Sequence, residues 1–341
     1  ETYGNVLEKI EADLQSFKLH ESRENQFYLT DFVADDLSRL DDDKVFKYLF
    51  HRYRYEIYPK IKYLDSFPPY LQIEPTSICN FRCVFCYQTD RSFTAKKSAH
   101  MGSMDFDLYK RIIDQAQSNI EFISLASRGE PSVNRLLPSF LRYSAGKFLG
   151  LKVNTNASLL TEDLCHSLLD NGAQTVVFSA DAADEELYKE LRVGGSLEKT
   201  IKNIELFKNI KERYYPTSNT ITRVSGVFVS TQQNMDDMIA TWSPLVDQIS
   251  FVSYNPWENV YDAKPSNVSA PCSDLWRRAF VWFDGTVNPC DTDYKSLLQV
   301  GNIDSVSINE VWCGENYNRL RALHELGQRS SIEPCRRCVV V

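Results

Sequence analysis

The sequence predicts an α/β fold, namely a partial (β/α)6 TIM-like barrel with a helical N-terminal extension and a small cysteine-rich C-terminal domain. Between residues 70 and 254, short apolar segments alternate with amphipathic ones. This pattern builds a parallel sheet, because parallel neighbours need a crossover helix, and six such units are too few to close an eight-stranded barrel. Apolar spacing is helical before this region, and the periodicity is lost after residue 256. We therefore expect domains at 1–67, 68–256 and 257–341.

The N-terminal extension is predicted to contain two helices. The first is indicated by apolar residues at helical spacing, Val6, Ile10, Leu14 and Phe17. The second begins near Asp41, where consecutive aspartates suit the start of a helix, and stops before Pro59. We expect these helices to form an accessory layer against the main domain.

The central region is predicted to contain six strands and five helices. Strands are expected at 71–74, 122–125, 152–155, 175–179, 223–229 and 248–254. Helices are expected between them at 106–118, 136–144, 162–171, 197–211 and 236–245. Ligands in such folds bind at the carboxyl ends of the strands, so functional residues are expected in the loops that follow them.

Composition narrows the class of protein. The charged fraction of 25% and hydrophobic fraction of 43% are ordinary for a globular protein. A net charge of −8 argues against a nucleic-acid-binding surface, which needs an excess of Lys and Arg. We find neither an apolar run that could span a membrane nor a leader pattern. A cytoplasmic protein acting on small molecules, with no nucleic-acid or membrane partner, is expected.

Three of the nine cysteines, Cys79, Cys83 and Cys86, form a C-x3-C-x2-C motif directly after the first predicted strand. The motif could be half of a structural zinc site, which needs four closing ligands. Alternatively, it could hold a [4Fe–4S] cluster by three thiolates, which leaves one iron open for chemistry. A clustered set of soft ligands in either case suggests a reducing compartment.

This motif, followed by the aromatic Tyr87, resembles the signature of the radical S-adenosylmethionine (SAM) superfamily. The resemblance implies that SAM binds the open iron and is cleaved to a 5′-deoxyadenosyl radical. Segments after the next three strands also resemble this family: SRGEP at 127–131, NTNAS at 154–158 and SAD at 179–181. Arg128 stands where the family usually has glycine and is expected to place a cation beside SAM or the substrate. The SAM contacts that the resemblance implies are Tyr87, Ser127, Gly129, Glu130, Asn154, Asn156, Ser179, Asp181 and Arg192.

A second site is predicted from four cysteines in the tail, Cys272, Cys290, Cys335 and Cys338. From their spacing alone they could form a zinc ribbon or ligate a cluster completely. The surrounding segments resemble the SPASM/twitch extension of radical SAM enzymes, which implies one auxiliary [4Fe–4S] cluster with a structural or electron-accepting role. The C-terminal region is then a small iron–sulfur domain, containing a hairpin that turns at Asp284 and Gly285.

Two cysteines remain outside these sets. Cys165 lies among leucines of a predicted helix and is expected to be a buried small hydrophobe. Cys313 is predicted to lie near the second cluster, where it could return a hydrogen atom to a substrate radical.

The resemblance implies an oxidoreductase that abstracts hydrogen from a carbinol carbon of a sugar or cyclitol, with the auxiliary cluster accepting an electron. The alternatives are an epimerase that uses Cys313, a peptide-modifying SPASM maturase and a non-enzymatic redox sensor. The helical N-terminus does not resemble the leader-binding module of the maturases. Substrate contacts are expected after the sixth strand, at Tyr254, Asn255, Trp257 and Glu258, and near Asp291 and Asp293; Tyr254 and Glu258 are the candidate catalytic residues.

An electron donor is also implied, either flavodoxin or ferredoxin, both of which are acidic. An acidic chain then needs a local basic patch for docking. Arg277, Arg278, Arg336 and Arg337 are the candidates, although they could equally serve to neutralise the auxiliary cluster.

Overall fold

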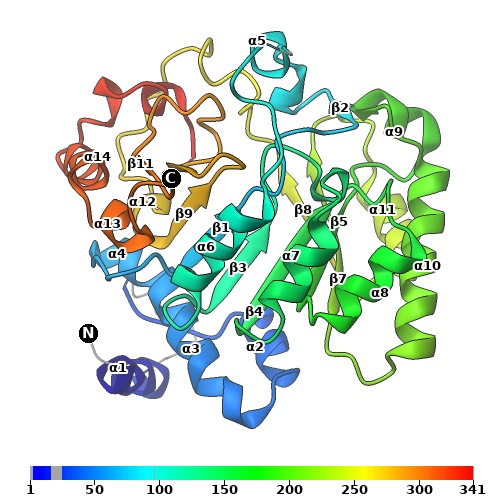
Figure 1. The fold of residues 1–341 in the computed structure, drawn as a ribbon, viewed down its shortest axis with the longest axis horizontal. Coiled ribbons are helices and arrows are strands. Elements are labelled where there is room, and N and C mark those ends of the chain that lie inside the picture. Colours follow the sequence, from blue (N-terminus) through cyan, green and yellow to red (C-terminus); the bar gives the residue numbers. More distant parts are fainter. Residues whose placement is uncertain (1–2, 17–24, 96, 341) are drawn as a thin grey trace.

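The computed structural model describes residues 3–16, 25–95 and 97–340. Phe17, predicted in the first helix, lies outside them. Within the described residues, nine strands form one sheet in the order β11-β10-β9-β1-β3-β4-β5-β7-β8. The seven strands from β9 to β8 are parallel, and β10 and β11 are antiparallel to their neighbours. The predicted α/β class and the open, curved parallel sheet are confirmed (Figure 1).

The six predicted strands of the central region are all present. They are β1 (Tyr70–Ile73), β3 (Phe122–Leu125), β4 (Gly150–Thr155), β5 (Thr175–Ser179), β7 (Ile221–Phe228) and β8 (Gln248–Ser253). The predicted helices are α6 (Phe106–Ala116), α7 (Leu137–Ser144), α8 (Glu162–Asp170), α10 (Leu197–Tyr214) and α11 (Met235–Trp242). Polar N-caps explain where several begin, as the Asp105 carboxylate accepts from the backbone of Leu108 at the start of α6.

Shorter elements were missed by the sequence analysis because they lack a full apolar period. They are the helices α5 (Arg91–Thr94) and α9 (Glu185–Leu191), and the strands β2 (Arg82–Cys83) and β6 (Arg192–Val193). The last two pair antiparallel in a separate two-stranded sheet, with Cys83 opposite Arg192.

Among the described residues, the N-terminal extension contains four helices, of which α2 and α3 line the base of the barrel. The four helices are α1 (Tyr3–Ser16), α2 (Asp31–Ser38), α3 (Asp42–Glu56) and α4 (Tyr58–Ile61), and Figure 1 shows α2 and α3 below the strands. The second predicted helix was expected to stop before Pro59, and α3 ends at Glu56. Pro59 itself lies in the first turn of α4, which was not predicted and where its missing N–H costs nothing. His51 stacks on Phe122 at 4.1 Å between ring centroids, which fixes α3 to the start of β3.

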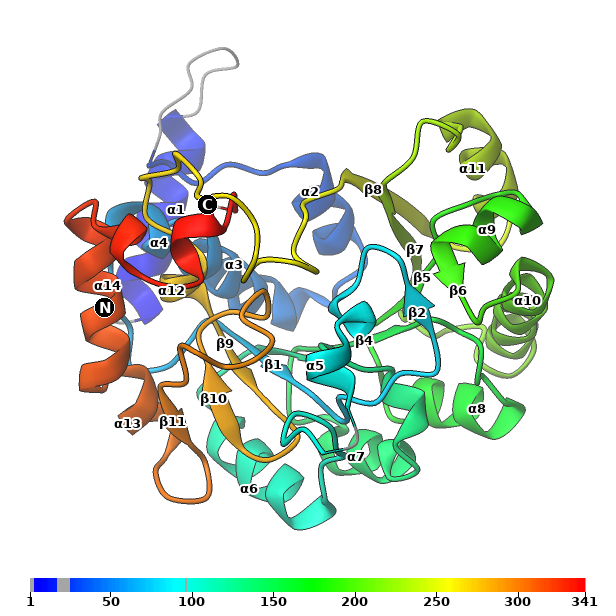
Figure 2. The same cartoon turned by 90° about the horizontal axis from the view of Figure 1, so that it is seen from above.

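The C-terminal region contributes strands to the same sheet. Its elements are α12 (Asp274–Arg277), β9 (Arg278–Val281), β10 (Thr286–Asn288), β11 (Gly301–Asn302), α13 (Ile308–Trp312) and α14 (Glu315–Glu325). The predicted hairpin is confirmed, and Gly285 supplies the positive φ of +81° in its turn. We did not anticipate that β9 would pair in parallel with β1, with Arg278 opposite Tyr70, so that the hairpin extends the barrel (Figure 2).

We predict that Arg54→Met destabilises the fold by about 3–5 kcal/mol, since breaking a buried ion pair leaves an uncompensated charge. The Arg54 guanidinium lies 2.7 Å from the Glu121 carboxylate and 2.8 Å from that of Asp65, and only 3% of its side chain is exposed. Denaturant unfolding of the anaerobically purified protein measures the change. Arg142→Met, at an exposed position of α7, is the matched control. A loss no greater than that of the control would contradict this assignment.

Candidate active site and auxiliary metal centre

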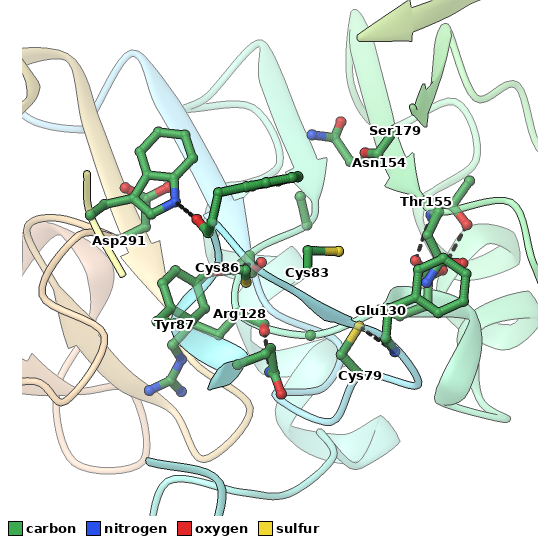
Figure 3. Close-up of a pocket in the computed structure, with 18 of the residues that line it drawn as sticks. Cys79, Cys83, Cys86, Tyr87, Arg128, Glu130, Asn154, Thr155, Ser179 and Asp291 are labelled. Atoms are coloured by element: carbon green, nitrogen blue, oxygen red, sulfur yellow. Dashed lines mark hydrogen bonds between the residues drawn. The ribbon is translucent and has the colours of Figure 1, made fainter. Parts of the chain in front are cut away.

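A cavity of about 410 Å³ opens at the carboxyl ends of the central strands. Three cysteines of the predicted first site, Cys79, Cys83 and Cys86, line it (Figure 3). So do eight of the nine residues predicted to contact SAM: Tyr87, Ser127, Gly129, Glu130, Asn154, Asn156, Ser179 and Arg192. The fold therefore brings segments that are more than 100 residues apart in sequence to one site, as expected for strand ends in a parallel sheet.

The three cysteine thiols are suited to an iron–sulfur cluster. Burial raises the pKa of the Cys79 thiol to about 12 and also raises the pKa values of Cys83 and Cys86. Such thiols stay protonated at neutral pH unless a bound cation stabilises the thiolates. The backbone N–H of Phe81 donates to the Cys79 sulfur at 3.4 Å, as protein groups around cluster ligands do.

The cavity also contains buried polar atoms that no protein group satisfies. Within the described residues, the Ser127 hydroxyl and the side-chain oxygen of Asn154 have no hydrogen-bond partner. Buried polar groups are almost always paired, so a polar ligand is expected beside them. This observation and the thiols together fit a cluster with SAM bound at its side.

Glu130 joins two of the segments that surround the cavity. Its carboxylate accepts from the Thr155 hydroxyl at 2.7 Å and from the Asn156 backbone at 2.6 Å. Burial raises the pKa of this carboxyl, and hydrogen bonds from Ser132 and Thr155 oppose the rise. Asn156 in turn donates to Asn80 at 2.9 Å, which connects the third strand's loop to the cysteine loop. Glu130 and Asn156 therefore use these polar groups to hold the loops around the cavity together.

Asp181 is the predicted SAM contact that does not line the cavity as the described residues define it. One of its carboxylate oxygens lies 2.5 Å from the Arg192 guanidinium, and the other accepts from the Val227 backbone at 2.7 Å. The pair holds Arg192, which does line the cavity, against the strand that carries Cys83. Asp181 is thus placed to position Arg192.

Arg128 lines the first cavity, so the expected cation does lie there, but its charge is already paired within the protein. Its guanidinium forms two hydrogen bonds with Glu74, at 2.6 and 2.7 Å, and donates to the Tyr294 carbonyl at 2.9 Å. It also lies over the Trp282 ring at 4.1 Å. Arg128 and Glu74 are almost fully buried, and they tie the SRGEP loop to the C-terminal region.

The four cysteines of the predicted second site lie together. Cys272, Cys290, Cys335 and Cys338 all line a second, small cavity of about 30 Å³ between the hairpin and the last turns of the chain. Burial raises the pKa of Cys335 to about 12 and that of Cys290 well above its usual value. Arg329, also buried, donates to the carbonyls of Cys335 and Cys338 and so fixes the loop between them.

A single stretch of chain separates the two cavities. Cys290 faces the second cavity, Asp291 lines the first, and Thr292 lines both. In the view of Figure 3, Asp291 lies across the first cavity from Glu130 and Thr155. Asp293, by contrast, accepts from the Tyr261 hydroxyl at 2.7 Å and from two backbone N–H groups and is structural.

Three predicted catalytic residues do not line the first cavity as the described residues define it. Cys313 lies at the end of α13, where its sulfur contacts the carbonyls of Asp65 and Ser66, and it lines neither cavity. Tyr254 donates to Glu258, and their loop sends Trp257 into the cavity instead. Trp257 donates to the Phe85 carbonyl at 2.9 Å, so this loop packs on the cysteine loop.

Sequence reasoning missed several cavity residues that lie beside the recognised motifs and not within them. Gln72 and Lys152 point inward from mid-strand positions, and Gln88 donates to the carbonyls of Ser77 and Arg128. For Gln72 and Lys152, the only signal in the sequence is a polar side chain in an otherwise apolar strand. Gln88 lies in the short 3-10 helix Tyr87–Thr89, directly after the C-x3-C-x2-C motif.

The four candidate docking arginines are already engaged. Arg278 faces the first cavity and lies 3.2 Å from Asp274, and Arg277 also pairs with Asp274. Arg336 and Arg337 both pair with Glu333. Cys165, as predicted, is fully buried in α8.

The fold and the two cysteine-lined cavities define a class of protein. The model of the Radical SAM superfamily matches residues 73–239, and that of the iron–sulfur cluster-binding SPASM domain matches residues 272–339. The chain therefore belongs to the radical SAM superfamily and carries a C-terminal SPASM domain. Its cofactors are SAM and iron–sulfur clusters. Among the described residues, no helix is long and apolar enough to cross a membrane.

Two known proteins are similar to most of the chain. The S-adenosyl-L-methionine-dependent 2-deoxy-scyllo-inosamine dehydrogenase of Niallia circulans is 22% identical and covers 81% of this chain and 94% of its own length. The tungsten-containing aldehyde ferredoxin oxidoreductase cofactor-modifying protein of Pyrococcus furiosus is 24% identical and covers 74% of this chain and 83% of its own length.

Two solved structures share the fold. BtrN in complex with AdoMet and 2-DOIA has a TM-score of 0.56 at 20% identity, covering 82% of this chain and 95% of its own. Streptococcus suis SuiB bound to the precursor peptide SuiA has a TM-score of 0.59 at 16% identity, and it covers 93% of this chain and 77% of its own.

We predict that Gly129→Ala lowers SAM affinity at least tenfold. A Cβ at this position would lie 2.3 Å from the Thr76 carbonyl oxygen and 2.6 Å from that of Ile78, so the SRGEP and cysteine loops must separate. Equilibrium binding of SAM to the reconstituted protein measures the effect. Gly4→Ala is the control, because no atom lies within 4 Å of its Cβ. Unchanged affinity would show that the two loops tolerate separation.

We predict that the Cys272→Ala/Cys290→Ala variant loses the second cluster only, so that bound iron falls from about eight to about four atoms per chain. Iron and sulfide analysis after anaerobic reconstitution measures this. Cys313→Ala, an exposed cysteine outside both cavities, should leave the count unchanged. A full count in the double variant would place the auxiliary cluster elsewhere.

Proposed function

We propose that this enzyme oxidises a secondary alcohol of a sugar or cyclitol to the ketone. The observation that carries the proposal is the shared wall: Asp291 and Thr292 face the first cavity, and Cys290, the residue before them, faces the second. A substrate bound against this wall lies one residue from a ligand of the auxiliary cluster. Such an arrangement suits a reaction in which the substrate must give up an electron.

When bound, the first cluster and SAM supply a 5′-deoxyadenosyl radical as hydrogen-abstracting agent, and the auxiliary cluster supplies an electron acceptor. The net reaction removes a hydrogen atom, a proton and an electron from the carbinol. The chain itself binds and orients the alcohol. Trp257 offers an aromatic face to the C–H surface of a sugar, and the Asp291 carboxylate can accept a hydrogen bond from a hydroxyl.

Similarity to known proteins agrees with this proposal. The relative from Niallia circulans, which this chain matches over most of its length, is by name a dehydrogenase of an aminocyclitol. BtrN, whose structure has the same fold, was crystallised with AdoMet and 2-DOIA. The name of the Pyrococcus furiosus relative indicates a different substrate, so the substrate class rests on the site as well as on similarity.

The epimerase alternative has less support. It requires a thiol that can return a hydrogen atom to the substrate radical, and Cys313 lies outside the cavity. Among the described residues, the cysteines that line the first cavity are the three predicted cluster ligands. The peptide-modifying alternative is supported by the structural likeness to SuiB. The assay described next tests it as well.

We expect the reduced enzyme, incubated anaerobically with sugars and cyclitols, to form one 5′-deoxyadenosine per ketone. Deuterium placed at the oxidised carbon should appear in 5′-deoxyadenosine. Replacing Cys79, Cys83 and Cys86 with Ala should abolish SAM cleavage, whereas Cys313→Ala should retain it. Solvent deuterium at the substrate carbon without a change in oxidation state would establish epimerisation instead, and modification of a peptide would exclude the sugar assignment.

A further inference from the structure

A second chamber, of about 190 Å³, lies beneath the active-site cavity. Its walls are the first residues of β1, β3 and β5 and the inner faces of α2 and α3, so it occupies the base of the barrel. Lys152 and Arg278 line both this chamber and the cavity above it. Lys152 lies two residues before Asn154 on β4 and therefore points to the same face of the sheet. The two spaces are thus adjacent along the barrel axis.

Positive charge predominates in this chamber. Four cationic side chains line it, Arg52, Lys152, Arg223 and Arg278, against one carboxylate, that of Asp36. Asp36 accepts from the Tyr48 hydroxyl at 2.6 Å and forms no ion pair within the described residues. Burial keeps His51, which also lines the chamber, uncharged at neutral pH by lowering its pKa to about 4.

Two of these cations form no ion pair among the described residues, although Asp36 attracts Arg223 at longer range. Arg52 pairs with Glu56 and Arg278 with Asp274. In the described part of the chain, neither Lys152 nor Arg223 has a carboxylate within 4 Å. Arg223 donates to the neutral side-chain oxygen of Gln248 at 2.9 Å and lies over the Phe32 ring at 4.5 Å.

Uncompensated cations at partly buried positions are costly, because desolvation is not repaid by an opposite charge. A bound anion would repay it, and a guanidinium can bind a carboxylate or phosphate through two parallel hydrogen bonds. The Tyr55 and Tyr70 hydroxyls, both in the chamber wall, add neutral hydrogen-bonding groups. The chamber thus has the chemistry of a site for a small oxyanion.

We propose that this chamber binds a carboxylate or phosphate group of the substrate, which makes the substrate an acidic or phosphorylated sugar or cyclitol. Lys152, at the junction of the two spaces, would contact the acidic group from the side of the reacting carbon, and Arg223 would bind it from below. This inference rests on the proposed function, because it takes a sugar-like substrate in the upper cavity as given.

Binding of four probes to the SAM-loaded, reconstituted enzyme without reductant tests the inference, since no turnover takes place. The probes are myo-inositol 1-phosphate, D-glucuronate, myo-inositol and inorganic phosphate, measured by calorimetry. At least one of the two acidic probes should bind at least tenfold more tightly than myo-inositol, and added salt should reduce that difference. Lys152→Met and Arg223→Met should each lower the affinity for the acidic probe at least tenfold, and Lys152→Arg should retain most of that affinity.

Lys199→Met and Arg142→Met, at exposed positions without ion pairs among the described residues, are the matched controls and should bind as the parent does. Thermal unfolding checks that every variant is folded. No preference for acidic probes, including no binding of any probe, overturns the inference. So does inorganic phosphate binding as tightly as myo-inositol 1-phosphate, because the anion would then be a free ion. If charge-dependent binding is found but no ketone forms on reduction, the inference stands and the proposed dehydrogenation fails.

Discussion

The carboxylate of Glu74, the residue after β1, holds together three segments of the chain that surround the two cysteine-lined cavities. It accepts two hydrogen bonds from the Arg128 guanidinium and others from the backbone N–H groups of Arg128 and Phe283. The strand, the SRGEP loop and the hairpin therefore meet at one buried ion pair. Because a buried charge is tolerated only when it is fully paired, these three segments can adopt few other arrangements. Both cavities depend on this, since the cysteine loop lies against the SRGEP loop and Cys290 follows the hairpin.

The parts of this arrangement that sequence could predict were the local ones. Strand and helix periods predicted the central sheet, and the C-x3-C-x2-C spacing predicted the first cysteine set, because each depends on residues that are close in sequence. The four tail cysteines are spread over residues 272–338, and their grouping was predicted from the resemblance to the SPASM/twitch extension. Arg128 shows what was out of reach. Its partners Glu74 and Tyr294 lie 54 and 166 residues away, so its role depended on register between distant segments. Lys152 was missed for the same reason, and Cys313 was misplaced because proximity in sequence to the tail cysteines did not bring it to their cavity.

The active-site cavity and the chamber beneath it differ in how their cations are paired. In the active-site cavity, Arg192 pairs with Asp181 and Arg128 pairs with Glu74, so the charges of these two arginines are neutralised before any ligand binds. Deeper in the barrel, Lys152 and Arg223 form no ion pair among the described residues, and Arg223 is attracted only at longer range by Asp36. The interior therefore changes from balanced at the strand ends to more positive at the base, which α2 and α3 cover. An electrostatic gradient of this kind orients a polar ligand along the barrel axis as well as binding it.

The parallel pairing of β9 with β1 also has a consequence for how the chain folds. During synthesis, β1 appears about 200 residues before the strand that covers its outer edge. Until residues 278–281 emerge, the nascent sheet presents an unpaired edge of the kind that recruits strands from other chains. Chains that stop short of the C-terminal region would therefore be expected to aggregate rather than to yield a free barrel. The C-terminal region in this enzyme is thus required for completing the sheet as well as for housing a metal centre.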